Sequence, residues 1–319
     1  GHCHAFLRRE ARRTYFLRSV KVSKNNTRLF LLDFSNTFYR QAAAHTHLSH
    51  NGQYTGGVYG FFKSLTSLVN TFGPGKIIAC CDRRPYLRSA LYAAYKQGRK
   101  RTELDKLKAL EENSDLCVSF LESLGVQVAA VDGLEADDLI ALFHEWHGHR
   151  FSETIAVSND SDLFQLLSHN FSMYRGQTSK ARKAKRPPYR YKLSHFFRAH
   201  PLLTMPSQWV EVLARAGTHN AVKGIEGVGP AKAMDEVVYG SKSKFHPLIT
   251  PHKDLVLANQ KLIELPFPDW RDATPVLPLE THSIKSTRQT VQFLARYGIQ
   301  VQAWHMDALD TILESSGLQ

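Results

Sequence analysis

The chain has 319 residues, of which 43% are hydrophobic and 22% are charged, and it carries a formal net charge of +12. This length suggests one large domain and a smaller one. No apolar run approaches the roughly 18 residues of a membrane-spanning helix, so we expect a soluble protein without a membrane partner. The four cysteines show no CxxC spacing, which favours a reducing compartment and argues against a zinc site.

The positive charge is concentrated in two segments. Residues 1–29 hold eight basic residues and one acid, and residues 175–192 hold eight basic residues and no acid, which leaves a net charge of −3 for the rest. Two basic segments on an otherwise acidic protein suit binding to a polyanionic partner. The alternative is that both segments are only solvent-exposed surface. Residues 1–28 also resemble a mitochondrial targeting segment, so we expect a mitochondrial protein or an arm that binds a partner.

Four strand-like apolar runs are each followed by carboxylates. The runs at 28–33 and 76–82 end in aspartate, and those at 126–131 and 154–157 precede further acids. The resulting set is Asp33, Asp82, Glu135, Asp137, Asp138, Asp160 and Asp162. The alternation of strand and helix signals up to about residue 175 predicts an α/β domain over 29–175, with a mostly parallel sheet flanked by helices. The acids would then meet at one edge of the sheet and suit Mg²⁺ or Mn²⁺, unless they only form strand-end turns.

Residues 83–108 form a basic helical stretch, which we call the gateway. Tyrosines alternate there with cations, among them Arg88, Tyr95, Lys96, Arg99 and Lys100. Cations and stackable rings together suit contact with phosphates and unpaired bases. The alternative is an exposed helix with half-buried tyrosines.

A Pro-Pro break and the lack of apolar periodicity predict a basic linker at 176–192, with Lys183, Lys185 and Arg186 contacting nucleic acid. Residues 193–319 have helical patterns and predict a second, helical domain. Between two of its helices lies a glycine turn flanked by lysines, comprising Lys223, Gly224, Gly227, Gly229 and Lys232. Such a turn can bind a phosphate through backbone N–H groups, although many glycine turns only connect helices.

These motifs together resemble the 5′-nuclease family, which includes flap endonucleases, phage 5′-3′ exonucleases and the 5′-nuclease domain of bacterial DNA polymerase I. The resemblance extends from about Leu29 to Val238. It is carried by LFLLDFSN, by ACCD with the downstream gateway cations, by GLEADDLIA and SNDSDLFQLL, and by GIEGVGPAKA. It implies a PIN-like 5′-nuclease core and a C-terminal helix-hairpin-helix domain, with the hairpin near residues 217–238.

The resemblance also implies roles for these residues. A first Mg²⁺ or Mn²⁺ would be held or supported by Asp33, Asp82, Glu135, Asp137 and Asp138, with Asp160 joining them. Asp160 and Asp162 would serve a second ion. Lys96 and Arg88 would neutralise the scissile phosphate, and the hairpin would hold the duplex.

One departure from the family pattern concerns the second ion. Where the family usually has two aspartates before the hairpin, this chain has Gly217 and Asn220. We therefore expect one well-formed metal site and a weakened second one. The predicted function is a structure-specific, metal-dependent 5′-nuclease acting on branched DNA or RNA–DNA primers. The alternative is a catalytically impaired nuclease-fold protein that binds nucleic acid within a mitochondrial ribonucleoprotein.

Overall fold

The structure is a computed structural model that describes residues 25–93, 95, 104–176, 187–218, 222–280 and 286–316. Several residues predicted to act on nucleic acid or metal lie outside these ranges, namely Lys96, Arg99, Lys100, Lys183, Lys185, Arg186 and Asn220. Residues 1–24 of the predicted arm also lie outside them. The arm was predicted four residues too long, because Asn25 already pairs with Phe151 in the sheet and the Arg28 Nε contacts Glu153 at 2.6 Å.

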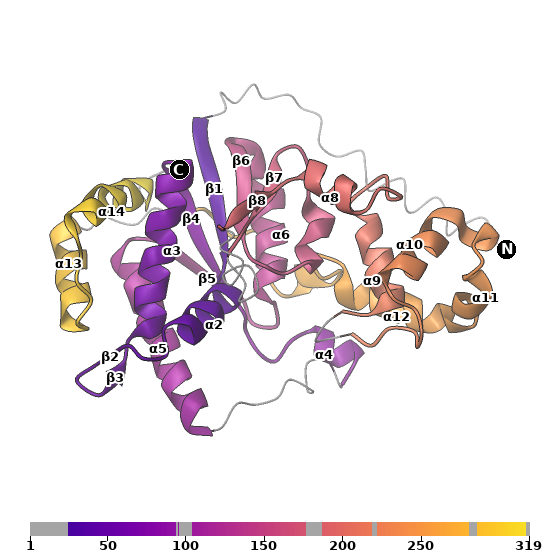
Figure 1. Ribbon diagram of the computed structural model, residues 1–319, viewed down its shortest axis with the longest axis horizontal. Coiled ribbons are helices and arrows are strands. Elements are labelled where there is room, and N and C mark those ends of the chain that lie inside the picture. The colour runs from indigo at the N-terminus through magenta and orange to yellow at the C-terminus, as the bar shows by residue number, and fades with distance from the viewer. Residues whose placement is uncertain are drawn as a thin grey trace.

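A six-stranded sheet forms the centre of the molecule, in the order β5-β4-β1-β6-β7-β8 (Figure 1). Its strands are β1 (Asn25–Asp33), β4 (Gly75–Cys81), β5 (Gln127–Ala130), β6 (Phe151–Val157), β7 (Phe171–Arg175) and β8 (Tyr189–Tyr191). Neighbouring strands are parallel except for the antiparallel pair β7–β8. This arrangement confirms the predicted mostly parallel sheet. A separate hairpin joins β2 (Ser49–His50) to β3 (Gln53–Tyr54).

The strand β8 lies inside the segment that was predicted to be a linker. Tyr191 pairs with Met173 of β7, and its ring is buried against Phe164 at a centroid distance of 4.7 Å. The last residues of the predicted linker are therefore part of the sheet. Three residues are too short a run for periodicity to be recognised, which is why the sequence did not reveal this strand.

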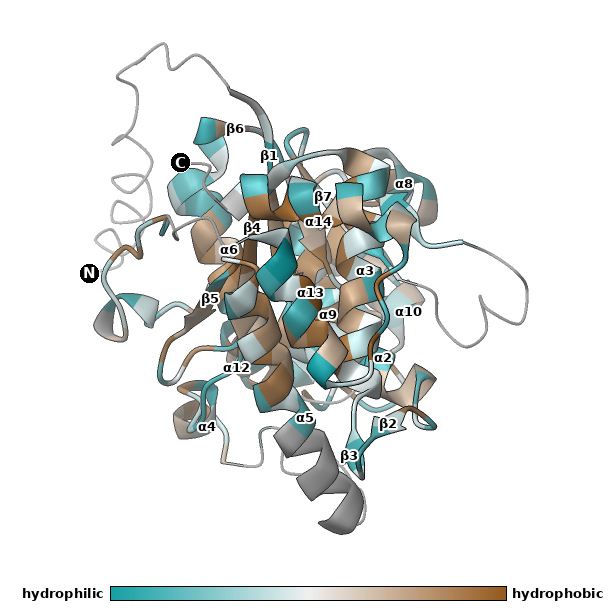
Figure 2. Ribbon diagram, turned by 90° about the vertical axis from the view of Figure 1, so that its left-hand side faces the viewer, coloured by the Kyte–Doolittle hydropathy of each residue, from teal (hydrophilic) through white to brown (hydrophobic). Residues whose placement is uncertain are grey.

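Both faces of the sheet are apolar and buried. Leu29 and Leu31 of β1 belong to one hydrophobic cluster, whereas Phe30 and Leu32 belong to the other, because successive side chains of a strand point in opposite directions. Helix α6 (Ala136–His147) covers the Leu29 face, and α2 (Phe34–Ala44), α3 (Gly56–Phe72) and α5 (Leu104–Ser123) cover the Phe30 face. Figure 2 shows the hydrophobic ribbon concentrated in the strands and in the helices next to them.

A helical region extends from the Leu29 face (Figure 1). It contains α8 (Leu193–Ala199), α9 (Gln208–Ala216), α10 (Pro230–Tyr239), α11 (His246–Ile249) and α12 (Lys253–Ile263), with short 3-10 turns between them. The gateway supplies one short helix, α4 (Arg88–Leu91), which contacts α12. Within the described part of the chain, no helix combines the length and apolar character needed to cross a membrane.

The last two helices, α13 (Thr287–Arg296) and α14 (Ala303–Ser316), pack on the α/β domain instead of the helical region (Figure 1). Leu294 and Leu309 are fully buried in the Phe30 cluster. In addition, the backbone N–H of Gly75 donates to the Ser315 Oγ at 3.1 Å. The predicted helical domain 193–319 therefore divides, and its last part belongs to the first domain.

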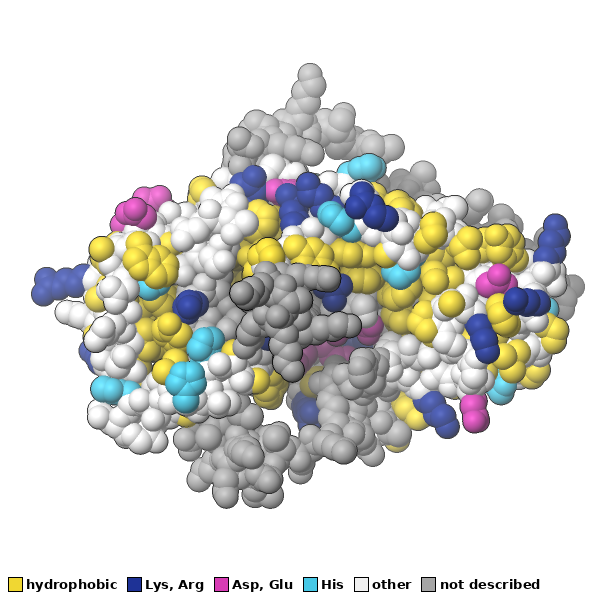
Figure 3. Space-filling model, in the orientation of Figure 1, with side chains coloured by type: hydrophobic (Ala, Val, Ile, Leu, Met, Phe, Trp, Pro, Cys, Tyr) yellow, Lys and Arg dark blue, Asp and Glu magenta, His cyan; other side chains and the backbone are white. Residues whose placement is uncertain are grey.

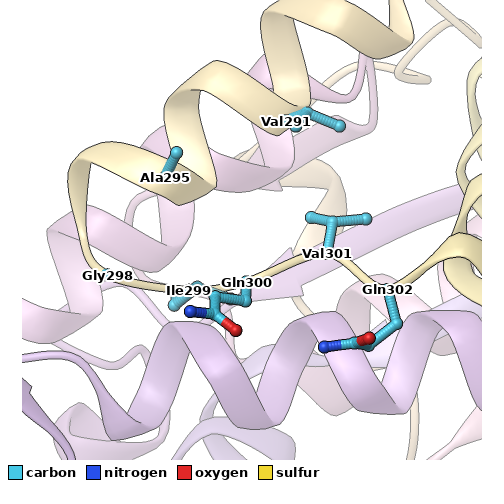
Figure 4. A pocket seen from close by; sticks show the side chains of 7 residues that line it. All are labelled: Val291, Ala295, Gly298, Ile299, Gln300, Val301 and Gln302. Carbon is cyan, nitrogen blue, oxygen red and sulfur yellow. The ribbon is translucent and has the colours of Figure 1, made fainter.

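A pocket of about 430 Å³ opens beside this C-terminal segment (Figure 4). It is lined by apolar and amide side chains from α13 and from the connection to α14, namely Val291, Ala295, Gly298, Ile299, Gln300, Val301 and Gln302. None of the predicted metal-binding acids lines it.

Candidate metal centre

Three aspartates meet at the carboxyl edge of the sheet. Asp33 is the last residue of β1, Asp82 directly follows β4, and Asp160 is the third residue after β6. Because β4 and β6 flank β1 in parallel, the three side chains emerge at the same edge. Figure 3 shows acidic side chains recessed near the middle of the molecule. The convergence agrees with the expectation from the sequence.

Asp33 is buried, and two donors hold its carboxylate. The backbone N–H of Asn36 donates to Oδ1 at 3.0 Å, and the Ser158 hydroxyl donates to Oδ2 at 2.8 Å. Burial raises the pKa of Asp33 to about 7, and repulsion from Asp82 and, more weakly, Asp160 adds to this increase. Crowded carboxylates with a raised pKa favour binding of a cation, because its charge removes the repulsion between them.

Asp82 connects the end of β4 to the start of α6. Its Oδ1 accepts the backbone N–H of Ala136 at 2.9 Å, and its Oδ2 accepts the Ser35 hydroxyl at 2.7 Å. An anion at a helix N-terminus is favoured by the unpaired N–H groups of the first turn. This contact places Asp82 beside the second group of acids, which begins at Glu135.

Glu135, Asp137 and Asp138 each offer one oxygen within 4.8 Å of the others. Asp138, however, already has a donor at each of its four lone-pair positions. Its Oδ2 accepts from Arg88 Nη1 at 2.5 Å and from the Glu135 backbone N–H at 3.0 Å, and its Oδ1 accepts from Arg88 Nη2 and the Phe267 backbone N–H, both at 2.8 Å. We therefore assign Asp138 to supporting the site and keep Glu135 and Asp137 as candidate ligands.

Arg88 occupies the interior, which differs from the exposed cation that the sequence predicted. Its side chain is 2% exposed. Its five N–H donors are matched by five acceptors, namely two oxygens of Asp138, one of Glu135, and the carbonyl oxygens of Leu262 and Glu264. A guanidinium has five donors, so no donor remains for a phosphate in this arrangement. The structure places Arg88 as a link between α4, α6 and the end of α12.

Tyr95 is also buried, whereas the sequence predicted a base-stacking residue. Its hydroxyl donates to Glu135 Oε2 at 2.8 Å, and its ring packs edge-on against Tyr86 at a centroid distance of 6.5 Å. Burial and the nearby charge of Glu135 raise the pKa of Tyr95 far above its ordinary value. The hydroxyl therefore stays protonated and remains a donor to Glu135.

Asp160 and Asp162 are arranged by the turn that begins η2 (Asp162–Leu166). The Asp160 N–H donates to the Ser158 hydroxyl at 3.0 Å, and the Asp162 N–H donates to Asp160 Oδ1 at 2.9 Å. Gln165 bonds this turn to the helical region through the backbone of Ile263, at 3.0 Å. Asp160 is close enough for its charge to act on Asp33, and Asp162 lies two residues farther along the turn.

The glycine turn joins α9 to α10, and its glycines differ in their surroundings. A Cβ at Gly224 would lie 2.2 Å from the carbonyl carbon of Ala216, so close packing by itself requires glycine there. A Cβ at Gly227 or Gly229 would meet no atom within 4 Å. Lys232 is half-buried, and its ammonium donates to the Gly227 carbonyl at 2.8 Å. Contact of this turn and of Lys223 with phosphates stays a prediction.

Gly217 packs directly against the same turn. Its φ is +81°, and a Cβ there would lie 2.5 Å from the backbone nitrogen of Gly224 and 2.8 Å from the carbonyl oxygen of Val222. An isolated β-bridge also joins it to Lys223. A side chain at this position would therefore require the turn to move, so that position 217 cannot supply a metal ligand in this backbone.

Three residues of the site escaped the sequence analysis. Ser35 and Ser158 hold Asp82 and Asp33, and Ser158 also contacts Asp160. Arg40 of α2 lies near Asp33. Burial lowers the pKa of Arg40, and the negative charge of Asp33 opposes this effect. The Arg40 Nη1 atom is buried and has no hydrogen-bond partner among the described residues. The serine in SNDSD, directly after a strand, was a usable signal, whereas nothing in the sequence distinguished Arg40.

Comparisons with known proteins agree with this geometry. Residues 28–192 match the model of the 5′-3′ exonuclease, N-terminal resolvase-like domain. The chain is 29% identical to the 5′-3′ exonuclease of Aquifex aeolicus over 217 residues, which are 67% of this chain and 70% of that protein. It is 28% identical to DNA polymerase I of Treponema pallidum over 210 residues, which are 64% of this chain but only 20% of the polymerase. The chain thus spans about a fifth of that polymerase.

A structural neighbour is the T5 D15 flap endonuclease in a complex with DNA and metal ions. The TM-score is 0.61 at 18% identity, and the alignment covers 91% of this chain and 100% of that one. The fold and the carboxylate edge define an α/β protein of the 5′-nuclease type. Because the family model matches just over half of its residues, the chain belongs to the 5′-3′ exonuclease N-terminal domain family.

Proposed function

We propose that this protein is a structure-specific, divalent-metal-dependent 5′-nuclease that hydrolyses phosphodiesters in branched or primer-containing nucleic acid. The observation that carries the proposal is the convergence of Asp33, Asp82 and Asp160 at one sheet edge, beside the N-terminus of α6 with Glu135 and Asp137. The family membership and the DNA in the complex of the T5 neighbour support the substrate class.

The carboxylates would hold the cation, and neighbouring donors would orient them. Asp33, Asp82, Glu135 and Asp137 are the proposed ligands of a first Mg²⁺ or Mn²⁺, with Asp160 beside them. Such an ion supplies the positive charge that phosphodiester hydrolysis needs in its transition state. Ser35 and Ser158 donate to Asp82 and Asp33, so that each aspartate is fixed before an ion arrives.

A weakened second ion site is part of this proposal. Asp160 and Asp162 remain as its carboxylates, whereas Gly217 offers no side chain and its packing against Gly224 leaves no room for one. Affinity for a hard cation decreases when charged ligands are lost. We therefore expect cleavage to require a higher concentration of divalent ion than an enzyme with two complete sites would need.

Cleavage of a 5′-flap substrate by the full chain tests the function. The substrate, labelled at its 5′ end, is incubated with Mg²⁺ or Mn²⁺ and with EDTA, and a parallel substrate carries an RNA primer. We expect metal-dependent release of the flap that is lost in Asp82→Asn. Asp115→Asn, which changes an exposed aspartate of α5, is the matched control and should cleave like the wild type. Intact substrate at stoichiometric protein would contradict the proposal.

A second candidate function is nucleic-acid binding without cleavage, within a mitochondrial ribonucleoprotein. The specific observation in its favour is that the backbone at position 217 requires glycine. The fold itself therefore excludes a metal-binding side chain at this position of the second site. Tight binding of the flap substrate without cleavage in either metal would support this candidate. Purification of the native protein free of RNA would argue against it.

A further inference from the structure

One oxygen of Glu135 is fully occupied by protein donors. Glu135 Oε2 accepts the Tyr95 hydroxyl at 2.8 Å and Arg88 Nη1 at 3.1 Å. A carboxylate oxygen has about two lone-pair positions, so these two donors use both. Glu135 would therefore offer a cation its other oxygen, Oε1. The two donors also fix the plane of the carboxylate, because they reach it from two different segments of the gateway.

The Tyr95 side chain is held firmly in this position. It is 8% exposed and belongs to the same hydrophobic cluster as Leu134 and Ala136, which flank Glu135 in the chain. Its backbone N–H donates to the Tyr92 carbonyl at 2.9 Å. A ring enclosed in this way offers no face on which a base could stack.

Arg88 connects the same carboxylate to the helical region. Its Nε donates to the Leu262 carbonyl at 2.8 Å and its Nη2 to the Glu264 carbonyl at 3.2 Å. The orientation of Glu135 thus depends on contacts with the gateway, and one of these gateway residues is itself anchored at the end of α12.

We propose that Tyr95 is a positioning residue of the metal centre, whose hydroxyl, together with Arg88, fixes the Glu135 carboxylate so that Oε1 faces the cation. The inference rests on the proposed function for the presence of a divalent ion at Glu135. In this role Tyr95 supports a ligand of the metal centre and does not contact nucleic acid. Residues that hold a ligand in this way tune metal affinity without touching the metal.

Mn²⁺ binding to the full chain, measured by titration calorimetry without nucleic acid, tests this role. The variant Tyr95→Phe removes only the hydroxyl, and we expect its affinity for Mn²⁺ to fall by about tenfold to a hundredfold. Tyr92→Phe, which changes an exposed tyrosine three residues earlier, should bind like the wild type. Thermal unfolding of both variants shows whether they are folded. In a Glu135→Gln background, Tyr95→Phe should cause no further loss, because the positioned carboxylate is absent.

Two results would overturn the inference. The first is unchanged Mn²⁺ affinity in Tyr95→Phe. The second is weaker binding of flap DNA in EDTA together with unchanged Mn²⁺ affinity, which would assign Tyr95 to nucleic-acid binding. Weaker Mn²⁺ binding by Tyr95→Phe, in a protein that leaves the flap substrate intact, would support the inference while contradicting the proposed nuclease function.

Discussion

Arg88 and Asp138 form a buried ion pair in which both guanidinium Nη atoms bond the two carboxylate oxygens, at 2.5 and 2.8 Å. Asp138 also accepts the Phe267 N–H, and Arg88 also donates to the Leu262 carbonyl. The pair therefore joins the gateway, the N-terminus of α6 next to Glu135, and the turn that follows α12. Through these contacts, the ion pair links the α/β domain to the helical region next to the metal centre.

Loss of the Arg88 side chain should destabilise the protein strongly. Arg88→Ala leaves the Asp138 charge buried without its partner, which typically costs about 3–5 kcal/mol. The free energy of unfolding from urea titration measures this cost. Arg83→Ala, which removes an exposed arginine of the same segment, should change it by less than about 0.5 kcal/mol. An Arg88→Ala protein of unchanged stability that binds DNA more weakly would instead support the phosphate contact predicted from the sequence.

Restoring an aspartate at position 217 should not rebuild the second ion site. Gly217→Asp places a Cβ 2.5 Å from the Gly224 nitrogen at a φ of +81°, so the turn must move. We expect a loss of stability of about 2–3 kcal/mol and no increase in the number of Mn²⁺ ions bound. Gly52 has a similar φ of +77°, but a Cβ there would meet no atom within 4 Å. The control variant Gly52→Asp therefore measures the cost of the backbone conformation without the steric clash. An additional bound ion in Gly217→Asp would contradict this expectation.

Stability without metal should depend on pH through Asp33. Its pKa of about 7 in the folded protein exceeds the ordinary value of 3.8, so the folded state holds a proton that the unfolded state releases. This contribution makes the folded protein less stable as pH rises from about 4 to 7, by up to about 4 kcal/mol. Urea unfolding in EDTA should show that Asp33→Asn gains stability relative to the wild type over this range. The difference between Asp115→Asn and the wild type should stay constant.

The C-terminal helices should contribute to the stability of the α/β domain. Leu309 of α14 is fully buried in the cluster that contains Phe30, and Leu309→Ala should cost about 2–5 kcal/mol in the free energy of unfolding. Leu257→Ala is the matched control, because Leu257 is 58% exposed on α12. Equal, small effects of the two changes would show that α14 is not part of the core.

The gateway shows why some predicted roles changed in the structure. A basic segment with interleaved tyrosines looks the same in sequence whether its side chains face solvent or the interior. Exposure depends on what packs over the segment, and here the end of α12, more than 170 residues away in the chain, encloses Arg88. The burial of Tyr95 has the same kind of cause, because its partner Glu135 comes from another element.

The sequence by itself determined the parallel sheet and the carboxylate edge of this protein. Apolar runs that end in Asp33 and Asp82 are local patterns, and parallel pairing brings such ends together whatever the details of packing. Only the tertiary structure decided that Asp138 and Arg88 support the site from within, that Gly217 is required by its contact with Gly224, and that α13 and α14 return to the first domain. These features depend on contacts between residues far apart in the chain, which no local pattern contains.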